Sequence, residues 1–70
     1  MERVAAHITG TVVRIEKRLG ESVSAGDVVV VLESMKMEMP VEVQGAGKVK
    51  EVRCTEGQAV SEGDLLVVIE

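Results

Sequence analysis

The 70-residue sequence has no Phe, Trp or Tyr, and it has one Pro, one His and one Cys. Because there is no aromatic ring on which a base could stack, and because the formal charge is −4, nucleic-acid binding is disfavoured. Cys54 has no second cysteine with which to close an internal disulfide, and His7 has no cysteine near it in sequence with which to bind a metal. We therefore expect no metal site, and we expect packing and hydrogen bonds to hold the fold in a reducing compartment.

Long apolar segments are also missing. The longest apolar run, residues 28–32, is far too short to span a bilayer, and no basic segment followed by an apolar core opens the chain. We therefore expect a soluble, cytoplasmic protein with no membrane association. What the sequence has in abundance is β-branched surface, with fifteen Val and three Ile. This composition and length predict one small all-β domain over residues 1–70.

The chain contains an internal repeat. A shift of 37 positions aligns residues 1–33 with residues 38–70 without a gap, and it places Gly10 on Gly47. Neither half can cover the apolar face of its own small sheet, so the two copies should pack on each other about a pseudo-twofold axis. The joint, residues 34–37, should then lie at one end of the domain, with both termini at the other.

Each half reads as strand, turn, strand, and both sheets together should make a flattened β-barrel or sandwich. Strands are predicted at residues 4–8, 11–16, 28–32, 38–43, 48–54 and 65–69, with short pieces near Val23 and Val60. Structural turn residues are predicted at Gly10, Gly20, Gly26, Asp27, Gly47, Gly57, Gly63 and Asp64.

The joint does not have the composition of an ordinary turn. Such connections usually consist of Gly, Asn, Asp, Ser or Pro, whereas Met35 and Met37 here flank a lone Lys36. A turn centred near Met35 and Lys36 would project the lysine amine into solvent. Because these residues lie in the one segment that the repeat does not explain, the usual assignment of Met side chains to the core is weakened here.

The segment Glu33-Ser34-Met35-Lys36-Met37-Glu38 resembles the attachment motif of biotinyl domains, usually Glu-Ala-Met-Lys-Met. Glycines also recur at equivalent positions in the two halves. The whole chain is similar to the biotinyl/lipoyl attachment family, and most of all to small stand-alone biotin/lipoyl attachment proteins. The resemblance implies a barrel-sandwich hybrid of two four-stranded antiparallel sheets. It also implies that the target lysine stands on an exposed hairpin.

The function implied by the resemblance is that of a carrier that catalyses nothing itself. A biotin protein ligase would attach biotin covalently to Lys36, with Glu33, Ser34, Met35, Met37 and Glu38 forming the recognition hairpin. A swinging carboxybiotin would then move a carboxyl group between biotin carboxylase and carboxyltransferase. The first half has no room for the protruding thumb of some acetyl-CoA carboxylase carriers, so the biotin should be mobile. We expect the carrier to be a monomer.

Two alternatives remain open. A Glu-Ser pair like Glu33-Ser34 also precedes the lysine motif in lipoyl domains. Lipoate, or both groups, could therefore be attached to Lys36. An unmodified interaction module of the same fold is the second alternative. A catalytic role is disfavoured, since one His and one Cys offer no set of acid, base and nucleophile.

Overall fold

The structure, a computed structural model, describes the whole chain from Met1 to Glu70. It consists of strands joined by turns, and no helix in it is long and apolar enough to span a membrane. The strands are β1 (Glu2–Ala5), β2 (Gly10–Ile15), β3 (Ser22–Val23), β4 (Val28–Ser34), β5 (Met37–Glu42), β6 (Gly47–Val52), β7 (Ala59–Val60) and β8 (Leu65–Ile69).

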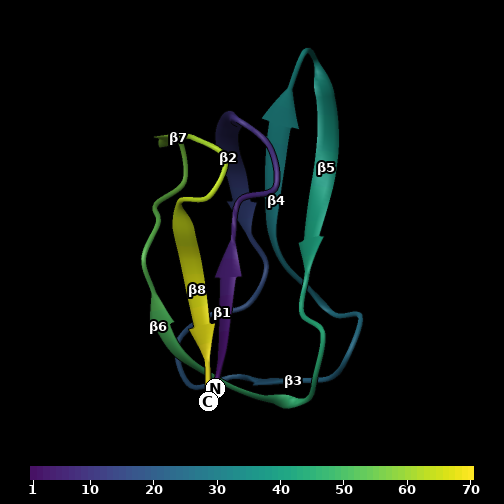
Figure 1. Cartoon of the computed structure of the whole chain (residues 1–70), viewed down its shortest axis with the longest axis vertical. Coiled ribbons are helices and arrows are strands. Elements are labelled where there is room, and N and C mark those ends of the chain that lie inside the picture. The colour runs from purple at the N-terminus through teal and green to yellow at the C-terminus, as the bar shows by residue number, and fades with distance from the viewer.

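The strands form two four-stranded antiparallel sheets, in the orders β1-β8-β6-β3 and β5-β4-β2-β7. This confirms the predicted fold class. Each sheet takes two strands from each half of the chain, so the halves are interleaved rather than side by side. The β4–β5 hairpin protrudes at one end of the molecule, and the two termini lie together at the other (Figure 1).

Backbone hydrogen bonds repeat at the same spacing of 37 residues as the sequence. Gly20 N donates to Val49 O at 2.9 Å, and Gly57 N donates to Val12 O at 2.7 Å. Both bonds join one half of the chain to the other. Because each half supplies partners for the polar backbone groups of the other, the two halves depend on each other for folding.

The core lies between the two sheets and is made of aliphatic side chains. Its largest fully buried members are Leu32, Leu66 and Ile69, and it includes no buried polar or charged side chain. Val31 is also buried but does not belong to this cluster. On the adjacent strands it lies next to Arg14 and Pro40. The alternation of β4 therefore places a valine on the outer face below the hairpin.

Equivalent turns close both halves. Ser24 N donates to Asp27 Oδ2 at 2.9 Å, and Ser61 N donates to Asp64 Oδ2 at 2.8 Å. Four turn residues have φ between 88° and 94°, a region that only glycine enters readily. They are Gly20, Gly26, Gly57 and Gly63.

Gly10 and Gly47, expected in turns, are instead the first residues of β2 and β6. Glycine is required at these two positions because the backbone of another segment lies too close for a side chain, and not because φ is positive. A Cβ at Gly10 would overlap the carbonyl oxygen of Glu33, and a Cβ at Gly47 would come within 2.5 Å of the carbonyl oxygen of Glu70.

Two strand predictions ran too far. The strand predicted at residues 4–8 ends at Ala5, because Ala6 N donates to Asp64 O and the chain then crosses to β2 in the other sheet. The strand predicted at residues 48–54 ends at Val52, after which Arg53 N donates to Leu66 O. In both places the alternation of apolar residues continues while the chain leaves the sheet, through the buried Ala6 in the first and the buried Cys54 in the second, so hydrophobic pattern does not mark the end of the strand.

Candidate functional site

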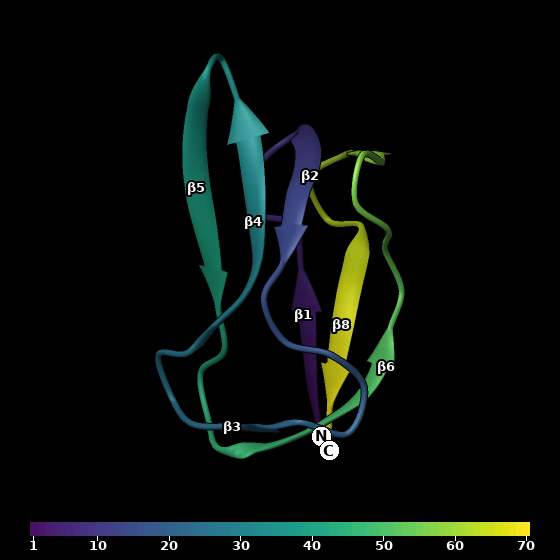
Figure 2. The same cartoon turned by 180° about the vertical axis from the view of Figure 1, so that it is seen from behind.

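The protruding end of the molecule is a two-residue hairpin turn. Ser34, the last residue of β4, pairs with Met37, the first residue of β5, and leaves Met35 and Lys36 as the turn. Both have positive φ, 55° for Met35 and 66° for Lys36. Figure 2 shows this hairpin extending past the neighbouring strand β2.

Positive φ at both central residues matches the right-handed twist of the paired strands, which is why two-residue hairpins favour it. Asn-Gly is the usual sequence for such a turn, and non-glycine residues held in this region cost about 1–3 kcal/mol each. The pairing of β4 with β5, from Val28 opposite Glu42 up to Ser34 opposite Met37, holds the turn in place. The tip is therefore a strained segment supported by a long ladder.

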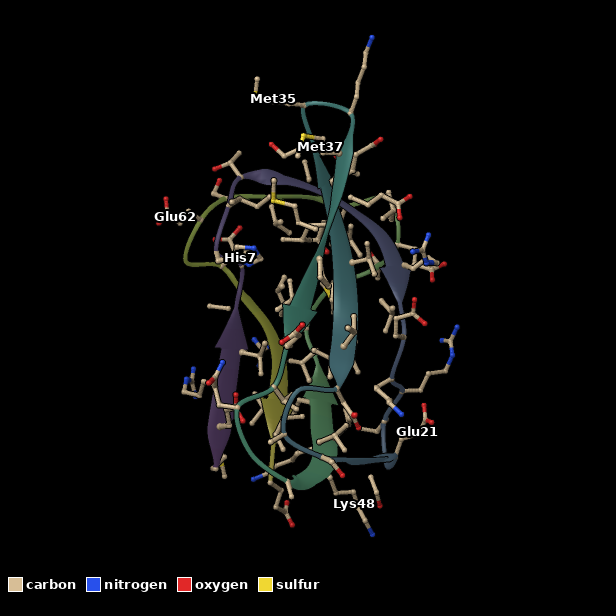
Figure 3. The ribbon with its side chains drawn as sticks, turned by 90° about the vertical axis from the view of Figure 1, so that its right-hand side faces the viewer. His7, Glu21, Met35, Met37, Lys48 and Glu62 are labelled. Atoms are coloured by element: carbon tan, nitrogen blue, oxygen red, sulfur yellow. The ribbon has the colours of Figure 1, made fainter.

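The side chains of the tip are presented to solvent. Met35 is 91% exposed and Met37 is 58% exposed, and both lie at the hairpin end of the molecule (Figure 3). Lys36 is exposed as well and takes part in none of the three ion pairs of the structure. The hairpin thus offers a free primary amine between two exposed thioether side chains.

An arginine on β2 reaches across β4 to Glu38, one residue pair below the turn of the hairpin. Arg14 donates through Nη2 to Glu38 Oε1 at 3.0 Å and through Nε to Glu16 Oε2 at 3.2 Å. The hydrogen bond to Glu38 is the main reason why the pKa of Arg14 is raised, and the bond to Glu16 adds to it. Glu33 lies opposite Glu38 in the register and makes no ion pair. Glu38 therefore has a partner within the chain, whereas the carboxylate of Glu33 is free.

The contact between Arg14 and Glu38 was not predicted. The two residues are 24 positions apart and lie on strands that are separated by β4. The sequence contains no signal that pairs position 14 with position 38, because that pairing depends on the order and register of the strands.

Gly10 lies directly under the hairpin. A Cβ placed there would overlap Glu33 O and would stand 3.5 Å from the Cβ of Ser34. The absence of a side chain lets β2 approach the last residues of β4, so Gly10 supports the position of the hairpin.

Groups elsewhere in the molecule do not converge on the tip. His7 is exposed and lines a hollow of about 490 Å³ between the edge strands β1 and β5. None of Met35, Lys36 and Met37 lines this hollow. Cys54 is buried, and burial raises the pKa of its thiol, which makes it a poorer nucleophile. No three His, Cys, Asp or Glu side chains are grouped so as to hold a metal ion.

Comparison with known proteins agrees with this geometry. The family described as "Biotin-requiring enzyme", the biotin/lipoyl family, matches residues 3–69. The chain belongs to the biotin/lipoyl attachment family. It is a carrier domain of this family, and the segment from Glu33 to Glu38, which resembles an attachment motif, lies at an exposed hairpin tip.

Two relatives are of nearly the same length as this chain. A protein of Mycobacterium leprae named "Biotinylated protein TB7.3 homolog" is 43% identical over 68 residues, which cover 97% of this chain and 96% of the relative. The "Biotin/lipoyl attachment protein" of Bacillus subtilis is 39% identical over 64 residues, covering 91% of this chain and 88% of the relative.

The fold also matches part of a much larger enzyme. The crystal structure of urea carboxylase from Kluyveromyces lactis superposes with a TM-score of 0.94 at 36% identity, covering 99% of this chain and 6% of that chain. This biotin/lipoyl attachment domain therefore resembles the biotin carrier domains of carboxylases.

Proposed function

We propose that this protein is a biotin carrier whose Lys36 is biotinylated by a biotin protein ligase. The observation that carries the proposal is the position of Lys36: an exposed amine with no ion-pair partner, at the tip of a protruding hairpin. A ligase can enclose such a tip without meeting the rest of the domain. The similarity to carrier domains of carboxylases supports the same assignment.

The acylation uses one group of this chain. The deprotonated Nζ of Lys36 attacks the acyl carbon of biotinyl-adenylate, forming an amide bond while the bond from that carbon to the phosphate oxygen breaks. The adenylate leaves with the bonding electrons, and the proton of the amine passes to solvent. The ammonium loses its positive charge when it is deprotonated before the attack, and the amide that forms keeps the nitrogen neutral.

Met35 and Met37 are suited to recognition by the ligase. Because they are 91% and 58% exposed, they contribute little to the core and offer flexible apolar contacts on either side of the amine. Ser34, half-buried at the end of β4, and Glu33, with its free carboxylate, complete the recognised hairpin. Glu38 acts with Arg14 to hold the start of β5, next to the turn.

Attached biotin supplies a ureido nitrogen that can carry a carboxyl group. The carrier presents this group on the flexible Lys36 side chain to the active sites of a biotin carboxylase and a carboxyltransferase, and the tether raises the local concentration of the group at each site. We propose that the domain acts as a monomer and catalyses no step itself. A reducing compartment such as the cytoplasm suits the free thiol of Cys54.

Lipoate is the second candidate group. Glu33 and Ser34 also occur ahead of the lysine in lipoyl domains, and the similar protein of Bacillus subtilis is named a biotin/lipoyl attachment protein. Acylation by a lipoyl ligase would use the same amine and the same hairpin.

Intact mass after co-expression with a biotin ligase, and separately with a lipoyl ligase, tests the proposal. We expect one biotinyl group on the wild-type protein and on Lys48→Arg, a matched exposed lysine at the opposite end of the molecule, and none on Lys36→Arg. If only a lipoyl adduct formed, lipoate and not biotin would be the attached group. If neither ligase gave an adduct, the carrier function would be refuted.

A further inference from the structure

The methionines of the chain are concentrated at the hairpin. Of the four Met residues, three lie between positions 35 and 39, and only Met1 lies elsewhere. Met35 and Met37 are 91% and 58% exposed, and both lie at the hairpin end of the molecule (Figure 3). Met39 is less exposed and pairs with the fully buried Leu32. Two thioether side chains are therefore open to small solutes on either side of Lys36.

The fold does not require methionine at these two positions. Residues 34–37 have no counterpart in the internal repeat, and neither Met35 nor Met37 belongs to the buried core. The turn itself disfavours Met35, which has a φ of 55° where Asn is the usual residue. Neither packing nor turn geometry accounts for the two thioethers.

An exposed thioether reacts with peroxides without help from a neighbouring group. The sulfur lone pair attacks one oxygen of hydrogen peroxide, the O–O bond breaks, and proton transfer gives a sulfoxide and water. Sulfur loses two electrons and the peroxide gains them. A thiol must first be deprotonated, and Cys54 is buried with its pKa raised by that burial. Peroxide should therefore oxidise the tip before it oxidises the only thiol.

A sulfoxide at the tip changes what a partner meets there and leaves the fold intact. In the free protein the new oxygen stays in water, because the side chains that carry it are exposed. A ligase that closes over the tip must remove this water, and a polar oxygen buried without a hydrogen-bond donor is unfavourable. Oxidation also turns a flexible apolar contact into a polar, chiral one. The cost of oxidation thus arises only in the complex with the enzyme that modifies Lys36.

We propose that Met35 and Met37 form a peroxide-sensitive modification site that controls the attachment of biotin to Lys36. This rests on the proposed carrier function. Sulfoxides at the two positions slow the biotin protein ligase. Methionine sulfoxide reductases restore the rate: a pair of reductase thiols gives two electrons and becomes a disulfide, the oxygen leaves as water, and the thioether returns. The protruding hairpin is as open to a reductase as it is to a ligase (Figure 1).

The test compares biotinylation of the unmodified protein before and after treatment with hydrogen peroxide. Peptide mapping by mass spectrometry counts the oxygens added at each Met. The kcat/KM of the biotin protein ligase should fall at least about tenfold for the form oxidised at Met35 and Met37. Treatment with the reductases for both sulfoxide epimers should restore it. Thermal unfolding followed by far-UV circular dichroism should be the same for the reduced and the oxidised protein.

Two variants locate the effect. Met35→Leu and Met37→Leu together keep apolar side chains that peroxide does not oxidise. The rate of this double variant should be the same before and after peroxide, although Met1, 78% exposed at the opposite end of the molecule, is oxidised in it. Met39→Leu is the matched control two residues along β5, and it should remain as sensitive to peroxide as the wild type. Each comparison is made within one protein, so a different starting rate in a variant does not affect it.

Failure of this proposal is distinguishable from failure of the carrier function. If the reduced wild type takes up no biotin, the carrier function itself is refuted, and this proposal with it. If the reduced protein is biotinylated, three results overturn this proposal alone: an oxidised form that reacts as fast, a double variant that peroxide slows equally, or a rate that the reductases do not restore. A lower Tm in the oxidised protein would also overturn it, because the loss of rate would then come from the fold.

Discussion

Replacing Met35 by Asn should separate the stability of the hairpin from its recognition. Met35 has a φ of 55° and its side chain is 91% exposed, so the residue bears the conformational cost of the turn without burying apolar surface. Asn tolerates the left-handed region better than Met does, because its short polar side chain can hydrogen-bond to nearby backbone. The substitution should therefore stabilise the fold.

The expected gain follows from the geometry. A non-glycine residue in this region costs about 1–3 kcal/mol, and we expect Asn to recover about 0.5–1 kcal/mol of it. For a domain of this size 1 kcal/mol shifts Tm by about 4–8 °C, so Tm should rise by about 2–8 °C. Since the side chain of Met35 is lost, biotinylation by the ligase should become slower although the fold is more stable.

Thermal and urea unfolding can be followed by far-UV circular dichroism, because the chain has no Trp or Tyr to report by fluorescence. Met37→Asn is the matched control. Met37 is exposed too, but it lies in β5 and is not among the residues with positive φ, so Asn there should give no gain. A loss of stability in Met35→Asn, or an equal gain in Met37→Asn, would refute the assignment of strain to the turn.

Three further substitutions, two of them with matched controls, test the packing of the fold. Gly10→Ala should destabilise the fold by about 1–3 kcal/mol because its Cβ would overlap Glu33 O, whereas Gly45→Ala, with open space around it, should have little effect on urea unfolding. Leu32→Ala should cost about 2–5 kcal/mol, and Leu19→Ala, at an exposed position, should stay near zero. Because burial raises the pKa of Cys54, the folded state holds the thiol proton more tightly than the unfolded chain. The contribution of Cys54 to the free energy of unfolding should therefore be constant below about pH 8.5 and should fall as the pH rises further. Urea unfolding measured from about pH 7 to 10 should show this fall in the wild type and not in Cys54→Ala.

Much of the fold follows from local sequence features. Turn chemistry is local: Gly20 and Gly57 enter the left-handed region, and Asp27 and Asp64 cap their turns through the residue three positions earlier. The 37-residue repeat then orders these turns along the chain, which is why the all-β architecture and the place of the hairpin could be predicted.

Strand ends were less predictable. In residues 4–8 and 48–54 every second residue stays apolar where the chain passes from one sheet to the other, so the hydrophobic pattern continues after the hydrogen-bond ladder has stopped. The end of each strand depends on where a partner strand lies, as the bond from Arg53 N to Leu66 O illustrates.

By itself the sequence determined the repeat, the sheet-forming composition and the exposed lysine between two methionines, since each of these depends on residues close together in the chain. The tertiary structure alone decided which distant residues meet. It placed Glu33 over Gly10, Arg14 against Glu38 and Leu19 beside Val52. The physical reason is that these contacts depend on strand order and register, and both arise only when the two halves pack together and bury their shared apolar core.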